Sequence, residues 1–201
     1  MKKQGAVIIF QKKPEKGKVK TRLAKTVGEE KAVAVYDYLL SHTHEQVLLL
    51  DIAVFVFFEK EIQAEFIFND NYFSSIQCKG DLGKRMEKAF EEVLGKGFRK
   101  AVIIGTDCPG LKAGLLQEAL RVLDARDLVI GPANDGGYYL LGMKRPHPEL
   151  FENIPWSTAT VFSDTMEVAA RLGLETGILQ QLTDVDIYED LDSSLKAKLG
   201  I

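Results

Sequence analysis

The chain has 201 residues, a formal net charge of −3, 46% hydrophobic residues and 27% charged residues. This length suits one well-packed domain and is short for two, so we expect a single domain over residues 1–201. The small net charge argues against a nucleic-acid-binding protein, and any anion site must therefore be local.

The sequence carries no feature of a secreted or membrane protein. The apolar run at 6–10 is too short for the core of a signal peptide, and no small-residue cleavage site follows it. No stretch approaches the roughly 20 apolar residues of a membrane span. Cys78 and Cys108 form neither a CxxC pair nor a disulfide framework. We therefore expect a reduced, cytoplasmic protein.

Hydrophobic patterns predict strands and helices that alternate along the chain. Strands are expected at 6–10, 52–58, 66–68, 75–78, 101–104, 128–130, 138–142 and 174–179. Helices are expected at 28–40, 80–97, 111–123, 160–172 and 188–199. Continuous apolar runs such as 6–10 and 52–58 are typical of strands covered on both faces. The order predicts an α/β fold of three α/β/α layers around a mostly parallel sheet.

In such folds, ligands bind beyond the carboxyl ends of the strands. The first segment of this kind, QKKPEKGKVKTRLAK, carries the basic residues Lys12, Lys18, Lys20 and Arg22. Gly17 permits close approach of the backbone, and basic side chains with free N–H groups suit a di- or triphosphate. A solvated basic surface loop is the alternative. The segment is neither a Walker A loop nor a GxGxxG turn.

The second segment, AVIIGTDCPG, ends a buried strand with Asp107. Mg²⁺ and Mn²⁺ take carboxylate oxygens and commonly keep waters and substrate phosphates as further ligands. Asp107 is therefore a candidate metal ligand. The alternative is that Asp107 only caps the helix expected from Leu111.

The third segment, GPANDGGYYLLG, places Gly136 and Gly137 after Asp135. Adjacent glycines suit a backbone that turns tightly beside a ligand, although Asp-Gly is also a strong hairpin signal. The two readings are compatible. Tyr138 and Tyr139 should point to opposite faces if they begin a strand.

The fourth segment, LTDVDIYEDL, is rich in acids. Glu189 and Asp190 fit the amino end of the last helix, where acids complement the helix dipole. Asp184 and Asp186 precede the helix and could reach a metal at the strand ends. By contrast, His42 and His44 are spaced so that their rings diverge, which disfavours metal binding.

Six motifs in order resemble a known bacterial family. They are GKVKTRL, GDLGKRM, IGTDCPGL, GPANDGGYYLLG, IPWSTATV and DVDIYEDL, and they cover nearly the whole chain. The family is a group of transferases placed with the nucleotide-diphospho-sugar transferases and often labelled radical-SAM/selenodomain-associated transferase 1. The resemblance implies a GT-A-like fold with a mixed, mostly parallel sheet.

The resemblance also implies roles for particular residues. Asp107 would be the first metal ligand and Asp186 the second, for Mg²⁺ or Mn²⁺. Phosphates of the nucleotide would be held by Lys12, Lys18, Lys20 and Arg22, and Asp81 would contact the nucleotide or substrate. From the residues themselves, the expected substrate-binding residues are Gly136, Gly137, Tyr138 and Trp156, with a place in the core as the alternative for Trp156. The chain departs from the family pattern at Lys13, Lys16, Asn134 and Ile187, none of which is an expected ligand.

Three functions are compatible with these segments. The first is a metal-dependent transferase that uses a nucleotide-diphosphate-linked donor, above all a glycosyltransferase that moves a sugar from an NDP-sugar to a small-molecule acceptor. Asp135 would then orient or deprotonate the acceptor hydroxyl. The second is a nucleotidyltransferase that joins an NTP to a phosphorylated acceptor and releases pyrophosphate. The third is a non-catalytic nucleotide-binding module.

Overall fold

The computed structural model describes residues 4–201, which form a seven-stranded sheet in the order β3-β2-β1-β4-β6-β5-β7. The strands are β1 (Ala6–Gln11), β2 (Ala53–Phe58), β3 (Tyr72–Ile76), β4 (Ala101–Ile104), β5 (Leu128–Pro132), β6 (Tyr138–Met143) and β7 (Thr176–Ile178). Only β6 runs antiparallel to its neighbours, β4 and β5. The carboxyl ends of the other strands therefore share one edge of the sheet with the amino end of β6.

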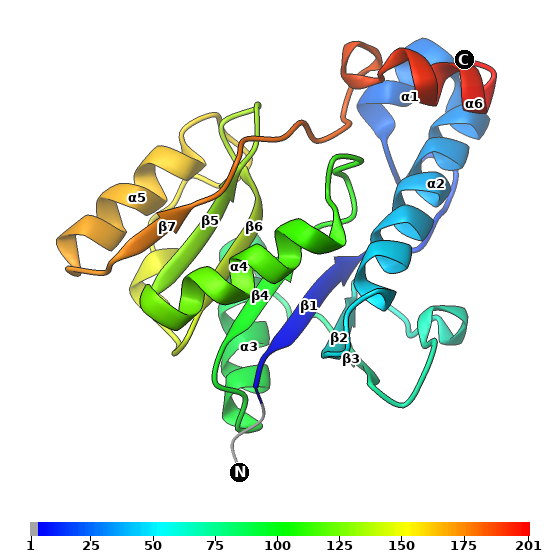
Figure 1. The fold of residues 1–201 in the computed structure, drawn as a ribbon. Coiled ribbons are helices and arrows are strands. Elements are labelled where there is room, and N and C mark those ends of the chain that lie inside the picture. Colours follow the sequence, from blue (N-terminus) through cyan, green and yellow to red (C-terminus); the bar gives the residue numbers. More distant parts are fainter. Residues whose placement is uncertain (1–3) are drawn as a thin grey trace.

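Helices cover both faces of this sheet. They are α1 (Thr21–Val27), α2 (Glu29–Leu48), α3 (Leu82–Gly95), α4 (Ala113–Ala125), α5 (Val161–Arg171) and α6 (Ser193–Leu199), with short 3₁₀ turns η1 (Ala64–Phe66), η2 (Pro148–Phe151) and η3 (Tyr188–Asp190). Helices α3 and α5 pack on one face, and α2 and α4 pack on the other (Figure 1). The predicted three-layer α/β/α fold is confirmed.

The alternation of side chains along β1 explains its unbroken apolar run. Ile8 packs in the core under α3 and α5, whereas Val7 and Ile9 pack in the core under α2 and α4. All three side chains are fully buried. A strand covered on both faces has no polar side, so an apolar run without alternation is what the fold requires.

The expected strand at 66–68 is wrong. Phe66 ends the 3₁₀ turn η1, and its ring stacks on His44 with the centroids 5.2 Å apart. Phe68 contacts the rings of His44 and Tyr72 in the same cluster. These side chains are held by ring packing and not by a strand ladder, which is why an apolar triplet was mistaken for a strand.

Other boundaries also differ from the expected ones. Helix α1 lies inside the segment expected to be a loop, and α2 continues to Leu48. The expected helix 188–199 is divided into η3 and α6 because Asp192 caps α6 by accepting a hydrogen bond from the Leu195 N–H at 2.7 Å. No helix within residues 4–201 is long and apolar enough to cross a membrane.

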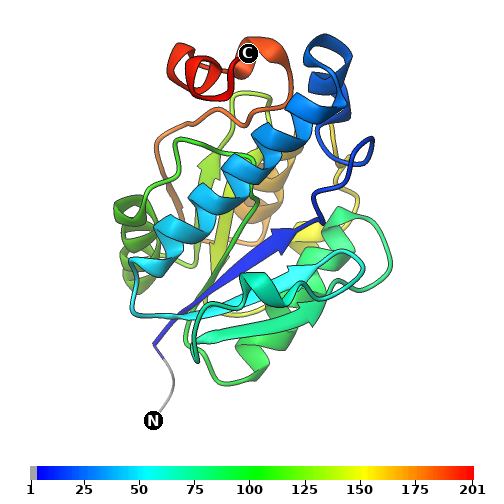
Figure 2. The same cartoon turned by 90° about the vertical axis from the view of Figure 1, so that its right-hand side faces the viewer.

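The chain's last helix returns to the region of its first two. Leu23 of α1, Leu39 of α2 and Leu195 of α6 are buried in one apolar cluster that also contains Val185. Helix α6, in red in Figures 1 and 2, packs on α2, and the preceding turn η3 packs on α1. This packing brings residues 183–190 over the carboxyl edge of the sheet.

The two histidines of α2 contact different neighbours, as expected. The His42 Nε2 lies 2.9 Å from the Leu111 carbonyl oxygen, whereas the His44 Nε2 lies 2.8 Å from Oε1 of Gln11. His44 is 1% exposed. Burial lowers the pKa of His44 to about 4 from its ordinary value of 6.5.

We expect His44 to make the protein less stable in acid. Because the folded chain gives up this proton at about pH 4 and the unfolded chain at about 6.5, the unfolded state binds more protons between these values. The contribution of His44 to the free energy of unfolding is complete above about pH 6.5. It is lost as the pH falls toward about 4, by up to about 3 kcal/mol.

Urea unfolding of the wild type and His44→Gln across this pH range measures the effect. The variant should show a weaker dependence of the unfolding free energy on pH, because glutamine has no proton to gain. Equal pH slopes in the two proteins would contradict the prediction.

Candidate functional site

At the carboxyl edge of the sheet, the side chain of Lys20 lies between two of the expected metal ligands. Its Nζ is 2.5 Å from Oδ1 of Asp107 and 3.6 Å from Oδ1 of Asp186. The Lys20 side chain is only 4% exposed, whereas the two carboxylates are 43% and 48% exposed. Asp107 and Asp186 are therefore close in space, although 79 positions separate them (186 − 107).

Backbone contacts bring these two acids together. The Val185 N–H donates to the carbonyl oxygen of Asp107 at 2.9 Å, which joins the segment after β4 to the segment after β7. Oδ2 of Asp190 accepts from the N–H groups of Asp186 and Ile187 at 2.8 and 2.9 Å. Asp190 therefore fixes the backbone that carries Asp186. This contact agrees with the expected place of Asp190 at the amino end of a helical segment, where free N–H groups need an acceptor.

The alternative role of Asp107 as a helix cap is wrong. Helix α4 begins at Ala113, and its N-cap residue is Lys112. The Asp107 side chain contacts Lys20 instead, which places it at the candidate site.

The site contains one further acid, Asp184, which the sequence alone left as an open candidate. One of its carboxylate oxygens, Oδ1, is buried without a hydrogen-bond partner among residues 4–201. Burial, followed by the negative charges of Asp107 and Asp135, raises the pKa of Asp184 to about 7. The sequence does contain a signal for Asp184. It lies two residues before Asp186, and residues i and i+2 of an extended segment share a face.

Asp135 reaches the same region from the loop between β5 and β6. Its Oδ1 accepts a hydrogen bond from the Gly137 N–H at 2.9 Å, and the side chain is exposed. Gly136 has φ = +89°, and a Cβ there would lie 2.0 Å from the carbonyl oxygen of Ala159. The double glycine therefore makes a tight turn against the chain before α5, and this turn fixes Asp135.

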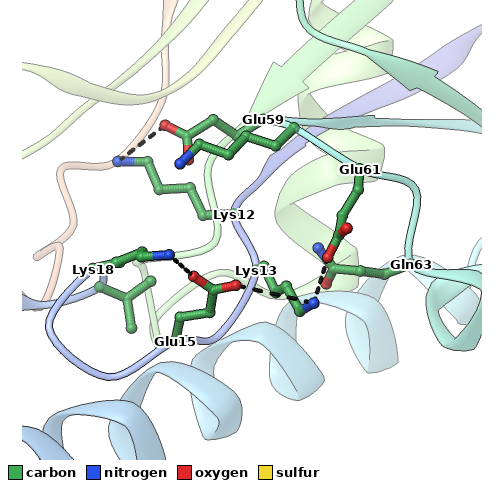
Figure 3. A pocket seen from close by; sticks show the side chains of 9 residues that line it. Lys12, Lys13, Glu15, Lys18, Glu59, Glu61 and Gln63 are labelled. Carbon is green, nitrogen blue, oxygen red and sulfur yellow. Dashed lines mark hydrogen bonds and ion pairs between the residues drawn. The ribbon is translucent and has the colours of Figure 1, made fainter.

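The basic segment divides into two parts. Lys12 and Lys18 line a pocket of about 140 Å³ that also involves Glu15, Glu59 and Gln63, and Figure 3 shows its side chains. In that pocket Lys18 pairs with Glu15, and Lys12 lies 4.0 Å from Glu59.

Gly17 takes φ = +74° in the turn beside this pocket. Lys20 and Arg22 belong instead to the carboxylate site, where the Arg22 Nη1 is 3.5 Å from Oδ2 of Asp186. The segment thus presents basic side chains on both sides of the turn.

Tyr36 of α2 fixes the start of this segment, a contact that the sequence did not predict. Its hydroxyl accepts from the Lys12 N–H at 3.0 Å and donates to the Lys12 carbonyl at 3.1 Å. The Thr106 hydroxyl lies 3.5 Å from the same oxygen. Burial raises the pKa of Tyr36 to about 12, so it stays a neutral donor.

The remaining expected substrate residues lie near the amino end of α3. Asp81 caps α3, since its Oδ1 accepts from the Lys84 N–H at 2.8 Å, and it lines a second pocket of about 410 Å³ with Glu152. The ring of Trp156 contacts the ring of Tyr138 edge-on. Trp156 and Tyr138 also pack against the core under α3 and α5. Tyr139 packs in the core under α2 and α4, so the two tyrosines lie on opposite faces of the sheet, as predicted. The substrate roles of Asp81, Tyr138 and Trp156 remain predictions.

Trp156 can lie close to α3 because Gly83 has no side chain. A Cβ at Gly83 would be 2.4 Å from the indole nitrogen of Trp156. We expect Gly83→Ala to displace this indole, which is the single tryptophan of the chain. The intrinsic fluorescence should shift to longer wavelength because the ring becomes more exposed to water.

Gly95→Ala, in the same helix, is the matched control, because a Cβ at Gly95 meets nothing within 4 Å. Its emission maximum should equal that of the wild type. An unchanged spectrum in Gly83→Ala would show that the helix and the indole are not in close contact.

Cys108 is a poor nucleophile in this environment. The residue is 4% exposed, and burial raises the pKa of its thiol to about 12, with a further contribution from the charge of Asp184. The thiolate is the reactive form of cysteine, so this shift disfavours covalent chemistry at Cys108.

The donor set fits a hard divalent cation that shares its coordination with a substrate. Residues 4–201 contain no group of three or more His, Cys, Asp and Glu side chains that could hold a metal by themselves. Asp107 and Asp186 nevertheless face one cation, the Lys20 ammonium. Mg²⁺ is commonly bound through one or two carboxylates together with substrate phosphates. Asp107 and Asp186 would supply the carboxylates.

Comparison with known families identifies the chain. Residues 42–158, more than half of it, match a family described as "Uncharacterized protein conserved in bacteria (DUF2064)". The chain belongs to this family. No curated protein matches this sequence.

Solved structures place this DUF2064 protein in the nucleotide-diphospho-sugar transferase fold. A candidate nucleotide-diphospho-sugar transferase from Desulfovibrio desulfuricans G20 is 31% identical with a TM-score of 0.85, over 96% of this chain and 90% of that chain. The resemblance inferred from the six motifs is thereby confirmed.

Two more distant structures show the same fold. The 4-diphosphocytidyl-2C-methyl-D-erythritol synthase from Anaerococcus prevotii DSM 20548 is 11% identical, with a TM-score of 0.61 over 99% of both chains. Rv0371c from Mycobacterium tuberculosis H37Rv, solved in complex with manganese, is 13% identical with a TM-score of 0.54, over 99% of this chain and 98% of that chain.

Proposed function

We propose that this protein is a divalent-cation-dependent transferase that uses a nucleotide-diphosphate-linked donor, with an NDP-sugar as the first candidate. The observation that carries the proposal is the convergence of Asp107 and Asp186 on one cationic group beside a lysine-rich loop. Carboxylates that face a cation suit a bound Mg²⁺ or Mn²⁺, and lysines nearby suit a diphosphate. The similarity to the candidate sugar transferase supports the same class of donor.

Each group has a distinct part in this proposal. Asp107 and Asp186 hold the cation, which when bound supplies charge stabilisation to the diphosphate that leaves. Lys12 and Lys18 bind the phosphate oxygens from the loop, and Arg22 binds them from α1.

The acceptor is proposed to meet Asp135. Gly137 holds one oxygen of this carboxylate, so its orientation is set before the acceptor binds. The carboxylate would orient the acceptor hydroxyl and take its proton as the new bond forms.

Nucleotidyl transfer is the second candidate. The lysines of the loop provide charge for a triphosphate, and the structural relative from Anaerococcus prevotii is by its name a diphosphocytidyl synthase. In this case an NTP would react with a phosphorylated acceptor and pyrophosphate would leave. A non-catalytic nucleotide-binding module is the third candidate, and the presence of Asp107, Asp135 and Asp186 together argues against it.

A thermal-shift screen of nucleotides and NDP-sugars, with and without Mn²⁺, tests the proposal. A ligand present well above its Kd should raise the melting temperature by about 2–4 °C for each kcal/mol of binding free energy, and only when Mn²⁺ is present. Product assays then separate the candidates, since glycosyl transfer releases an NDP and nucleotidyl transfer releases pyrophosphate. Binding without turnover on any acceptor would favour the non-catalytic module, and no Mn²⁺-dependent binding would refute the proposal.

A further inference from the structure

Lys20 occupies a cage of oxygens that resembles the coordination of a metal ion. Its Nζ lies 2.5 Å from the Val185 carbonyl oxygen, in addition to its contacts with Asp107 and Asp186. The ammonium carries only donors, and the oxygens of Asp107 and Val185 are within hydrogen-bond distance of it, whereas Asp186 at 3.6 Å contributes an ion pair.

Lys20 differs in this respect from the lysines nearest to it in the loop. The side chains of Lys12 and Lys18 are 54% and 63% exposed and pair with glutamates at the surface, whereas that of Lys20 is 4% exposed. A buried charge is tolerated only when it is paired and hydrogen-bonded. The two carboxylates likewise need a positive charge between them whenever no metal ion is bound.

The backbone of Lys20 is held in an unfavourable conformation. Its φ of 47° and ψ of 42° fall in the left-handed region, which costs energy for any residue with a Cβ. Lys20 stands at the junction between the lysine-rich loop and α1.

We propose that Lys20 is a resident cation that exchanges with the divalent cation of the proposed function. Without metal, its single positive charge offsets part of the negative charge of Asp107 and Asp186. A divalent cation between the same carboxylates would lie about 2.0–2.6 Å from their oxygens and would leave no place for the ammonium. Lys20 then turns out of the cage toward the diphosphate, so that metal binding and phosphate binding are coupled.

The affinity of the metal-free protein for Mn²⁺ provides the first test. Because the cage can take a metal ion only while Lys20 is out, the apparent Kd of the wild type equals the intrinsic Kd divided by the fraction of molecules in which Lys20 is out. Lys20→Met should therefore lower the Kd for Mn²⁺ by on the order of tenfold or more. Electron paramagnetic resonance of free Mn²⁺ measures this constant without substrate or turnover.

Lys25→Met is the matched control for charge, because it makes the same substitution as Lys20→Met. Lys25 lies on α1 and its side chain is exposed. Its removal takes away one positive charge while leaving the cage occupied by Lys20, so the Kd should change less than about twofold because exposed charges are screened.

Chemical labelling of the wild type provides a second test that does not depend on a variant. In metal-free protein, Lys20 should resist an amine-acylating reagent, and saturating Mg²⁺ should increase its labelling several-fold, as measured by peptide mass spectrometry. Lys25, exposed on α1, should react equally with and without Mg²⁺.

The outcomes separate this inference from the function on which it rests. Equal Mn²⁺ affinity in the wild type and Lys20→Met, or continued protection of Lys20 in Mg²⁺, would overturn the exchange even if Mn²⁺ binds. Absence of Mn²⁺ binding to both proteins, in the presence and absence of nucleotide, would overturn the exchange and the metal-dependent function together.

Discussion

Asp107→Asn is expected to abolish nucleotide binding that depends on Mg²⁺ or Mn²⁺. The amide keeps the shape of the side chain but loses the charge that faces Lys20 and the proposed cation. If the transferase reaction is found, kcat/KM should fall on the order of 10³-fold, because a lost metal ligand weakens charge stabilisation of the leaving group. Isothermal titration calorimetry with and without the metal measures the Kd for the nucleotide directly.

Asp124→Asn is the control for removal of an acid. Asp124 pairs with Lys100, just before β4 and thus at the opposite edge of the sheet from Asp107. Its side chain is 68% exposed, and the variant should bind metal and nucleotide as the wild type does. Unchanged metal-dependent binding in Asp107→Asn would remove the central claim of the proposed function.

Gly136→Ala is expected to destabilise the protein by more than about 3 kcal/mol, since it combines a steric clash with backbone strain. The new Cβ would lie 2.0 Å from the Ala159 carbonyl oxygen, and an L residue would have to adopt φ = +89°. A backbone atom cannot turn aside as a flexible side chain can, so the loop that carries Asp135 must move. The melting temperature should fall by roughly 6–12 °C.

Gly114→Ala is the matched control for this substitution. Gly114 lies in the first turn of α4, and a Cβ there would meet nothing within 4 Å. Alanine is the better helix former, so this variant should be unchanged or more stable by up to about 1 kcal/mol. Equal melting temperatures for Gly136→Ala and Gly114→Ala would contradict the prediction, because they would show that the loop can move away from the Ala159 carbonyl oxygen without loss of stability.

The unbroken apolar runs are enough to predict the layers of this protein from its sequence. Val7, Ile8 and Ile9 predicted a strand covered on both faces because burial on two sides leaves no polar alternation. The alternation of strands with amphipathic helices then predicted the carboxyl edge as the place for a site. It was for this reason that Asp107 could be selected from the sequence as a candidate site residue.

The errors fell where contacts distant in sequence override a local pattern. Phe66 and Phe68 suggested a strand, but their rings pack on His44 of a preceding helix. The lysine-rich segment was expected to be a loop throughout, but α1 begins within its last part. Local periodicity carries no information about such partners, because they are set by how the layers come together.

The sequence by itself determined which residues could carry charge at the carboxyl edge, and the tertiary structure decided how that charge is arranged. Lys20 resembled Lys12 and Lys18 in the sequence, as one of several basic residues in a loop. Folding buries it between Asp107 and Asp186, which follow different strands. The reason is physical: burial of an ammonium requires oxygens from segments that meet only when the sheet and the last helix are in place.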